Sequence, residues 1–256
     1  MPRSIVVFDI DGVIRDVGNS YRRAIADTVA EFTQGAYRPT LADIDRLKTE
    51  GVWNNDWEAS QELVYRYWES QDRVRSQIYL DYGAIINFFQ ARYRGRNFDG
   101  YIANEPLLAT PEYFQSLSDN EIAWGFFSGA TRGSAEYVLK DRLGLSDPLL
   151  IAMEDAPSKP DPTGLLAVLS AVEGENPTEL APVFYVGDTV ADMYTVEKAK
   201  VVQPQRQWFA IGILPPHVQV NGSRQADYTE SLNAAGAKIV LNNVQDLTVA
   251  QIRDLL

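Results

Sequence analysis

Residues 5–13 read IVVFDIDGV, and this stretch decides the fold of the chain. Its first four residues are apolar and largely β-branched, which predicts a short buried strand. Asp9 and Asp11 follow two positions apart, and Gly12 breaks the strand because glycine adopts backbone angles that other residues resist. Carboxylates at the end of a strand are exposed to a ligand rather than to the core. An isolated pair of this kind is also typical of an ordinary polar loop, so its interpretation depends on the rest of the chain.

The composition excludes several classes of protein. The chain has 256 residues and a net charge of −12, and no basic stripe offsets the acid, which argues against nucleic-acid binding. It has no cysteine and one histidine, which excludes disulfides, cysteine zinc sites and multi-histidine metal sites. No apolar run approaches the length of a membrane span. Because the N-terminus enters a strand at once, we expect no signal peptide and a cytoplasmic protein. The sequence does not indicate the oligomeric state.

Short strands alternate with helices of about ten residues in the second half of the chain. We expect strands at residues 122–127, 149–153, 182–186, 208–214 and 238–241. We expect helices at residues 111–117, 132–143, 162–172, 190–199, 224–234 and 248–255. This alternation predicts an α/β fold, a Rossmann-like parallel sheet with helices on both faces.

Residues 15–104 carry helical patterns and no convincing strand. Ser20 suits a helix N-cap, and apolar residues follow it at helical spacing. Thr40 and Asp43 resemble a capping box that opens a short helix. Two long helices are expected at residues 56–71 and 76–94. We therefore expect an inserted helical domain at residues 15–104 and a core domain made of residues 1–14 and 105–256.

Polar residues follow the predicted strands, where each strand ends. In addition to Asp9 and Asp11, the strand-end groups are Ser128 with Gly129, Lys159 between two prolines, and Asp188 with Asp192. A small hydroxyl and a glycine before a helix suit an anion, because amide groups and the helix dipole point at it. In parallel sheets ligands bind beyond the carboxyl ends of the strands, so we expect all these groups at one edge.

The acidic residues in this set predict a metal. Four carboxylates without a cation would repel one another and bind protons, and a divalent ion resolves that conflict. Oxygen ligands without histidine or cysteine suit a hard ion, so we expect Mg²⁺. Asp9 is then a candidate nucleophile, and Asp11 beside it is a candidate for moving a proton.

The ordered set resembles the haloacid dehalogenase superfamily, in its phosphatase branch with a helical cap inserted after the first strand. The resemblance covers the whole chain and rests on four elements in the family's order. These are the D-x-D-G-V stretch, the strand-end serine, the Lys-Pro pair and the G-D-x-x-x-D stretch. The family's halide-removing enzymes lack the second acid of D-x-D, so Asp11 favours phosphate chemistry.

The resemblance implies a role for each residue of the cluster. Asp9 would attack phosphorus to form an aspartyl-phosphate, and Asp11 would protonate the leaving alkoxide and then activate water. Ser128 and the amide of Gly129 would hold the phosphoryl oxygens, and Lys159 would neutralise negative charge.

The same resemblance implies a metal site. Mg²⁺ would be held by Asp9, the carbonyl of Asp11 and Asp188. Asp192 would support the site, although it could also simply cap the helix that follows Asp188.

The specificity residues are expected in the turn between two helices of the insert. By resemblance these are Lys48, Trp53, Asn54 and Asn55, which suit a polar leaving group better than a second phosphate. The expected function is a Mg²⁺-dependent phosphatase acting on a small phosphorylated metabolite. A phosphomutase on the same scaffold and an idle binding or regulatory domain are the alternatives. Phosphoglycolate, sugar phosphates and an amino-alcohol phosphate such as histidinol phosphate all remain open as substrates.

Overall fold

The chain divides into two compact units. The computed structural model describes residues 3–53, 55–174 and 179–256. One unit, the core, consists of Met1–Asp16 and Pro106–Leu256, and the other, the insert, is Val17–Glu105. From the sequence, we expected the domain boundaries after residue 14 and before residue 105.

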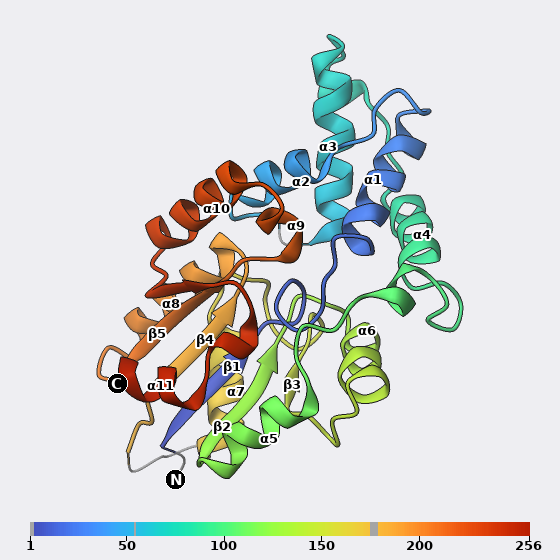
Figure 1. Cartoon of the computed structure of the whole chain (residues 1–256). Helices are drawn as coiled ribbons and strands as arrows, with labels where there is room; N and C mark the ends of the chain where they lie inside the picture. Colours follow the sequence, from blue (N-terminus) through green and yellow to red (C-terminus); the bar gives the residue numbers. More distant parts are fainter. Residues whose placement is uncertain (1–2, 54, 175–178) are drawn as a thin grey trace. The chain divides into compact units, whose positions relative to one another are not determined.

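The core is built on a sheet of six parallel strands in the order β3-β2-β1-β4-β5-β6 (Figure 1). The strands are β1 Ser4–Phe8, β2 Ile122–Phe127, β3 Leu150–Ile151, β4 Val183–Gly187, β5 Trp208–Ile213 and β6 Ile239–Leu241. This architecture confirms the predicted Rossmann-like α/β fold. Because β1 lies between β2 and β4, its end meets the ends of both neighbours.

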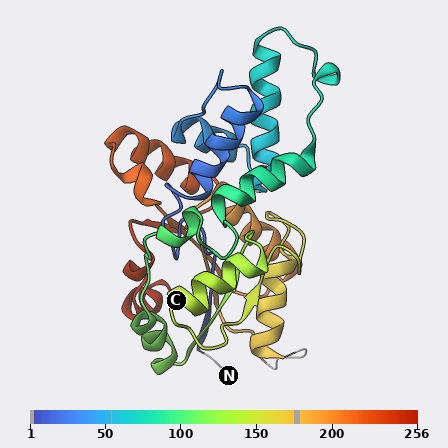
Figure 2. The ribbon, with the colours of Figure 1, turned by 90° about the vertical axis from the view of Figure 1, so that its right-hand side faces the viewer.

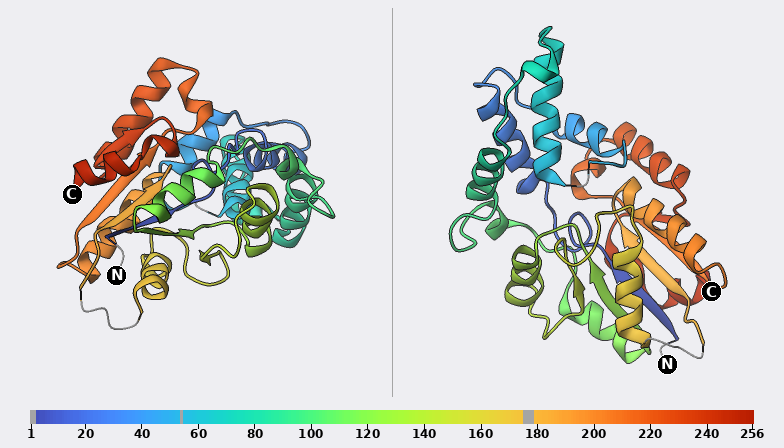
Figure 3. Two further views of the ribbon diagram at one scale, coloured as in Figure 1. Left: turned by 60° about the horizontal axis from the view of Figure 1, so that its bottom comes forward. Right: turned by 180° about the vertical axis from the view of Figure 1, so that it is seen from behind.

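Helices flank this sheet. The α-helices of the core are α5 Pro111–Asp119, α6 Arg132–Glu136, α7 Thr163–Glu173, α8 Val190–Val202, α9 Pro216–Gln219, α10 Gly222–Ala234 and α11 Val249–Leu255. A π-helical stretch, Tyr137–Arg142, continues α6, and a 3₁₀ turn, Val244–Asp246, precedes α11. In the view from behind, α7 lies along the face of the sheet (Figure 3).

Alternation along β1 assigns its side chains to the two faces of the sheet. Ile5 and Val7 belong to a buried cluster with apolar residues of α7 and α8. Phe8 points the other way and contacts the rings of Tyr113 and Phe114 in α5. Since successive side chains of a strand alternate, the next residue, Asp9, returns to the side of α7 and α8.

In the described residues of the insert, the regular secondary structure is helical. Its helices are α1 Tyr21–Phe32, α2 Leu41–Lys48, α3 Asp56–Ser70 and α4 Tyr82–Tyr93, with 3₁₀ turns at Arg75–Gln77 and Tyr101–Asn104. Helix α1 packs against α3 and α4 (Figure 2). The capping box at Thr40 and Asp43 is confirmed, because each side chain accepts a hydrogen bond from the other's backbone amide.

The bounds of two predicted elements were wrong. The helix expected over residues 76–94 begins only at Tyr82, because the side chain of Asp81 accepts a hydrogen bond from the amide of Ala84 and caps it there. Ser20 occupies the N-cap position of α1, as predicted, although its hydroxyl donates to the carbonyl of Val17 and makes no capping hydrogen bond to the helix. Strand β3 is shorter than residues 149–153.

Among the described residues, no helix combines the length and the apolar character that crossing a membrane requires.

Candidate active site at the carboxyl ends of the strands

The register of the sheet brings three strand ends to one level. Phe8 of β1 pairs with Phe126 of β2 and with Val186 of β4. The amide of Asp9 continues the ladder by donating to the carbonyl of Val186 over 2.8 Å. Asp9 is therefore held by backbone pairing, and its carboxylate is buried, with a residue exposure of 6%. Strand pairing thus fixes the candidate nucleophile before any side-chain contact is considered.

Lys159 lies between two carboxylates. Its Nζ is 2.8 Å from Oδ1 of Asp9 and 2.6 Å from Oδ1 of Asp192. The lysine side chain is 2% exposed, so these contacts are shielded from water. A buried ammonium needs partners, and here two carboxylates from different strand ends supply them. Residues 9, 159 and 192 come from three separate segments of the core, which the fold brings together as predicted.

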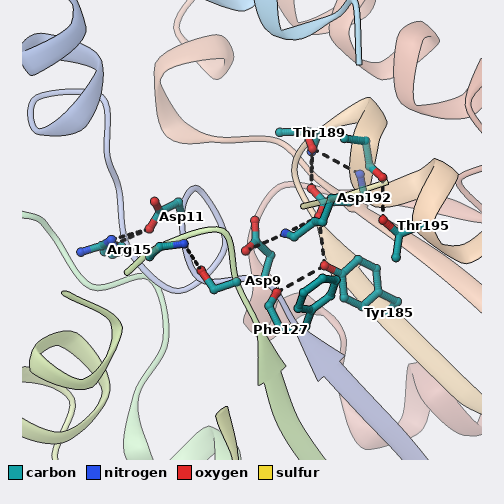
Figure 4. A network of polar contacts seen from close by, with 12 residues as sticks. Asp9, Asp11, Arg15, Phe127, Tyr185, Thr189, Asp192 and Thr195 are labelled. Atoms are coloured by element: carbon teal, nitrogen blue, oxygen red, sulfur yellow. Dashed lines mark hydrogen bonds and ion pairs between the residues drawn. The ribbon is translucent and has the colours of Figure 1, made fainter. Parts of the chain in front are cut away.

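Asp192 is saturated by protein donors (Figure 4). Its Oδ1 accepts hydrogen bonds from Lys159 and from the hydroxyl of Tyr185, which is 3.0 Å away. Its Oδ2 accepts from the amide of Thr189 over 2.9 Å and from the Thr189 hydroxyl over 2.6 Å. Asp192 therefore caps α8, which is the simpler of the two roles expected for it from the sequence. It also positions Lys159.

The electrostatics of the cluster follow from its burial. Burial raises the pKa of Asp9 to about 7 from 3.8, against the opposing effect of Lys159. The negative charges of Asp192 and Asp11 add to the increase. For Lys159, burial alone would lower the pKa, but the carboxylates of Asp192 and Asp9 outweigh it and hold the pKa well above its usual value. The lysine thus stays cationic, and the charge of Asp9 is costly without a further cation.

The carboxylates can hold a metal ion. One oxygen each of Asp9, Asp188 and Asp192 lies within 4.8 Å of the others, and all three residues are buried. Gly12 makes room for this approach, because a Cβ at that position would lie 2.1 Å from Oδ2 of Asp188. Since Asp192 is already saturated, Asp9 and Asp188 are the carboxylates suited to the ion. Buried carboxylate oxygens without nitrogen or sulfur fit Mg²⁺.

The turn after β2 offers hydrogen-bond donors. Ser128 is buried, and its Oγ accepts a hydrogen bond from the amide of Ala130 over 3.1 Å. In the described part of the chain, the Ser128 hydroxyl and the Gly129 amide donate to no protein acceptor. Two such donors at the edge of a parallel sheet suit the oxygens of an anion.

Asp11 lies outside the group of three carboxylates. Its side chain, 21% exposed, forms an ion pair with Arg15, four residues further along. Arg15 was not expected at the site from the sequence, although its spacing of four residues from Asp11 was a readable signal. Tyr185 was not expected either, although its position in β4, on the face toward α8, could have pointed to the contact with Asp192.

The residues expected to read the leaving group lie in the insert. Lys48 pairs with Asp56 over 2.7 Å, and the indole of Trp53 donates to Glu50 over 2.7 Å. Oδ1 of Asn55 accepts hydrogen bonds from the amides of the first turn of α3 and caps that helix. Asn54 lies outside the described residues. These contacts give three of the four residues partners within the insert itself.

Sequence comparison relates the chain to known proteins. Residues 4–200 match the haloacid dehalogenase-like hydrolase family. The chain is also 30% identical, over 247 residues, to an imidazoleglycerol-phosphate dehydratase from Phytophthora nicotianae. That match covers 94% of this chain and 50% of the relative, so the chain spans about half the length of that protein.

Solved structures share the fold. A phosphonoacetaldehyde hydrolase-like protein from Oleispira antarctica superposes with a TM-score of 0.72 at 17% identity, over 100% of this chain and 93% of its own. The phosphatase Tt82 from Thermococcus thioreducens superposes with a TM-score of 0.58 at 22% identity, over 88% of this chain and 98% of its own.

Proposed function

Since the chain belongs to the haloacid dehalogenase-like hydrolase family, we propose that it is a Mg²⁺-dependent phosphatase of a small phosphorylated metabolite. One observation carries the proposal. The buried carboxylate of Asp9 lies 2.8 Å from the cation of Lys159, and one of its oxygens is within 4.8 Å of a carboxylate oxygen of Asp188. An anionic nucleophile can approach a phosphate dianion only where positive charge offsets the repulsion, and this arrangement supports a lysine and a metal at that place.

The proposed reaction has two halves. A carboxylate oxygen of Asp9 forms a bond to phosphorus while the bond from phosphorus to the ester oxygen breaks. A proton passes from the carboxylic acid of Asp11 to that oxygen, and the alcohol leaves. In the second half, the oxygen of a water molecule bonds to phosphorus, its proton passes to Asp11, and the Asp9–phosphate bond breaks. The products are an alcohol and inorganic phosphate, and the enzyme is restored.

The remaining groups serve binding and charge. The hydroxyl of Ser128 and the amide of Gly129 are proposed to donate to the phosphoryl oxygens. This role is supported because neither group donates to a protein acceptor among the described residues. Lys159 offsets the charge on Asp9, and Asp192 keeps the lysine in place. Mg²⁺, held by Asp9, Asp188 and the carbonyl of Asp11, would supply further positive charge next to the phosphoryl group.

We propose that the insert acts as a cap that chooses the substrate. The strand-end cluster can recognise a phosphoryl group and a metal but not the alcohol attached to it. Lys48, Trp53, Asn54 and Asn55 are the proposed specificity residues. Trp53→Ala and Asn54→Ala should lower kcat/KM for the true substrate and spare a small aryl phosphate. Equal losses for both substrates would contradict this role.

The acidity of the chain supports a small-molecule substrate rather than nucleic acid, and we propose action in the cytoplasm without a membrane partner.

The substrate is best sought with a panel of phosphate esters. Phosphoglycolate, sugar phosphates and histidinol phosphate represent the acid, sugar and amino-alcohol classes. Histidinol phosphate carries an imidazole and has a second reason for inclusion. A relative whose match covers 94% of this chain is named imidazoleglycerol-phosphate dehydratase. That name describes a protein about twice as long, so its activity is not carried over to this chain.

The test is release of inorganic phosphate by the wild type, by Asp9→Asn and by chelated protein. Activity that Mg²⁺ restores after chelation, and that Asp9→Asn abolishes, would support the proposal. Full activity of Asp9→Asn would rule out the aspartyl-phosphate. Transfer of phosphate to a second hydroxyl, without release, would identify the phosphomutase alternative instead. No turnover of any ester, aryl phosphates included, would favour an idle binding domain.

A further inference from the structure

Arg15 contacts Asp11 in a one-sided way. Its Nε donates to Oδ1 of Asp11 over 2.7 Å, and its Nη2 lies 2.5 Å from the same oxygen (Figure 4). Within the described residues, the second carboxylate oxygen, Oδ2, accepts no hydrogen bond, and the Asp11 side chain is 21% exposed. One oxygen of the carboxylate is therefore fixed, and the other is left for an external group.

The arginine itself is held firmly. Its side chain is completely buried. Its carbonyl accepts a hydrogen bond from the amide of Gly12 over 3.0 Å, which closes the turn that carries Asp11. Arg15 also forms an antiparallel β-bridge with Leu107, which lies near the start of the second segment of the core. A buried side chain on a doubly paired backbone has few alternative positions, so it can impose an orientation on its partner.

A second buried arginine in the core shows what a purely structural pair looks like. Arg206 contacts both carboxylate oxygens of Glu173, with its two terminal nitrogens at 2.9 and 2.6 Å, and also donates to the carbonyl of Ala181. That pair leaves neither oxygen of Glu173 without a partner. The pair at Asp11 differs because both of its nitrogens converge on a single oxygen.

We propose that Arg15 is a positioning residue for Asp11: it holds Oδ1 so that Oδ2 faces the oxygen of the leaving group. This inference rests on the proposed function, in which Asp11 gives a proton to that oxygen and later takes one from water. The proton travels on Oδ2, and the guanidinium stabilises the carboxylate that remains after the transfer. The leaving oxygen lies opposite Asp9 across the phosphorus atom, which agrees with the position of Asp11 outside the group of three carboxylates.

The test compares an alkyl and an aryl phosphate. Expulsion of an alkoxide needs a proton, whereas expulsion of a 4-nitrophenolate does not, and kcat/KM reports only the steps up to departure of the alcohol. For Arg15→Gln we expect kcat/KM to fall by about 10- to 100-fold for the alkyl ester that the wild type hydrolyses fastest. For 4-nitrophenyl phosphate the fall should stay within about threefold, in line with the weak need for an acid.

A double-mutant cycle separates positioning from general damage. Asp11→Asn should show the same selectivity, and adding Arg15→Gln to it should cause no further loss with the alkyl ester. Arg15→Lys keeps the buried charge and should recover part of the loss, so it also serves if Arg15→Gln does not fold. Arg206→Gln is the matched control: it breaks a buried arginine–carboxylate pair of the core and should leave the alkyl-to-aryl ratio unchanged.

The outcomes distinguish the two hypotheses. Equal losses for both esters, or losses that add to those of Asp11→Asn, would overturn the positioning role and leave the phosphatase proposal standing. A rise in alkyl turnover would overturn it as well, because Arg15 would then hold Asp11 away from the substrate. If the wild type hydrolyses no ester at all, the proposed function fails, and the role of Arg15 in catalysis falls with it.

Discussion

Asp9→Asn should stabilise the metal-free protein while abolishing its activity. The change keeps the shape of the side chain and removes one negative charge from the buried cluster. The neutral amide is a weaker acceptor for Lys159 than the carboxylate, but that lysine retains Asp192 as its partner. In the wild type, burial raises the pKa of Asp9 from 3.8 to about 7 even with Lys159 beside it, so the net effect of the surroundings disfavours the charge.

The size of the effect follows from that difference. At 1.36 kcal/mol for each pKa unit, the rise from 3.8 to about 7 corresponds to about 4 kcal/mol of unfolding free energy. The sign is fixed by linkage: the folded state binds this proton more tightly than the unfolded state does. The cost of the charge is therefore absent below about pH 4, grows as the pH rises towards 7 and is complete above it.

The assay is urea unfolding in the presence of a chelator, followed by circular dichroism at pH 8 and at pH 5. At pH 8 the unfolding free energy of Asp9→Asn should exceed that of the wild type by up to about 4 kcal/mol, and at pH 5 by less than half of that. Asp227→Asn, at an exposed position in α10, changes the net charge equally and should shift stability by under about 0.5 kcal/mol. If chelated Asp9→Asn is no more stable than the wild type at pH 8, the charge is not costly and the electrostatic account of the cluster is wrong.

Three further predictions concern other residues of the molecule. Asp188→Ala should lose activity as chelation does, and Mg²⁺ should no longer raise its unfolding temperature; an increase equal to that of the wild type would remove Asp188 from the metal site. Tyr185→Phe removes a buried donor to Asp192 and should lower the unfolding free energy by about 1 kcal/mol. Its kcat should fall by less than about tenfold, because Lys159 keeps its contacts, and a loss as large as that of Lys159→Ala would contradict this. Asn55→Ala should lower the unfolding free energy by about 1 kcal/mol, since the amide side chain caps α3, and an unchanged stability would exclude the cap.

The order of the strands could not be read from the sequence, but the position of the site could. Short apolar runs followed by polar residues predicted which residues stand at strand ends. The carboxyl ends of parallel strands meet at one edge whatever their order, so Asp9, Ser128, Lys159 and Asp188 were expected together. The structure brings Asp9, Lys159 and Asp188 into one cluster.

Helix caps were predicted with mixed success, although the partner of each capping side chain lies only a few residues away. The capping box at Thr40 depends on a residue three positions away and was predicted correctly. The start of α4 was placed at residue 76, whereas the helix begins at Tyr82 because the side chain of Asp81 caps it there. Asn55 was expected to face a substrate, and the structure shows its oxygen capping a helix, a role that its position just before α3 also allowed.

By itself, the sequence determined the fold class, the helical insert and the residue types gathered at one edge of the sheet, because these follow from periodicity and from where strands end. Only the tertiary structure decided how those residues share their partners. It pairs Lys159 with Asp9 and Asp192, which lie 150 and 33 positions away in the chain, and it pairs Asp11 with Arg15. The choice of partner for a buried charge depends on distances of a few ångströms between segments remote in sequence, and no pattern along the chain encodes those distances.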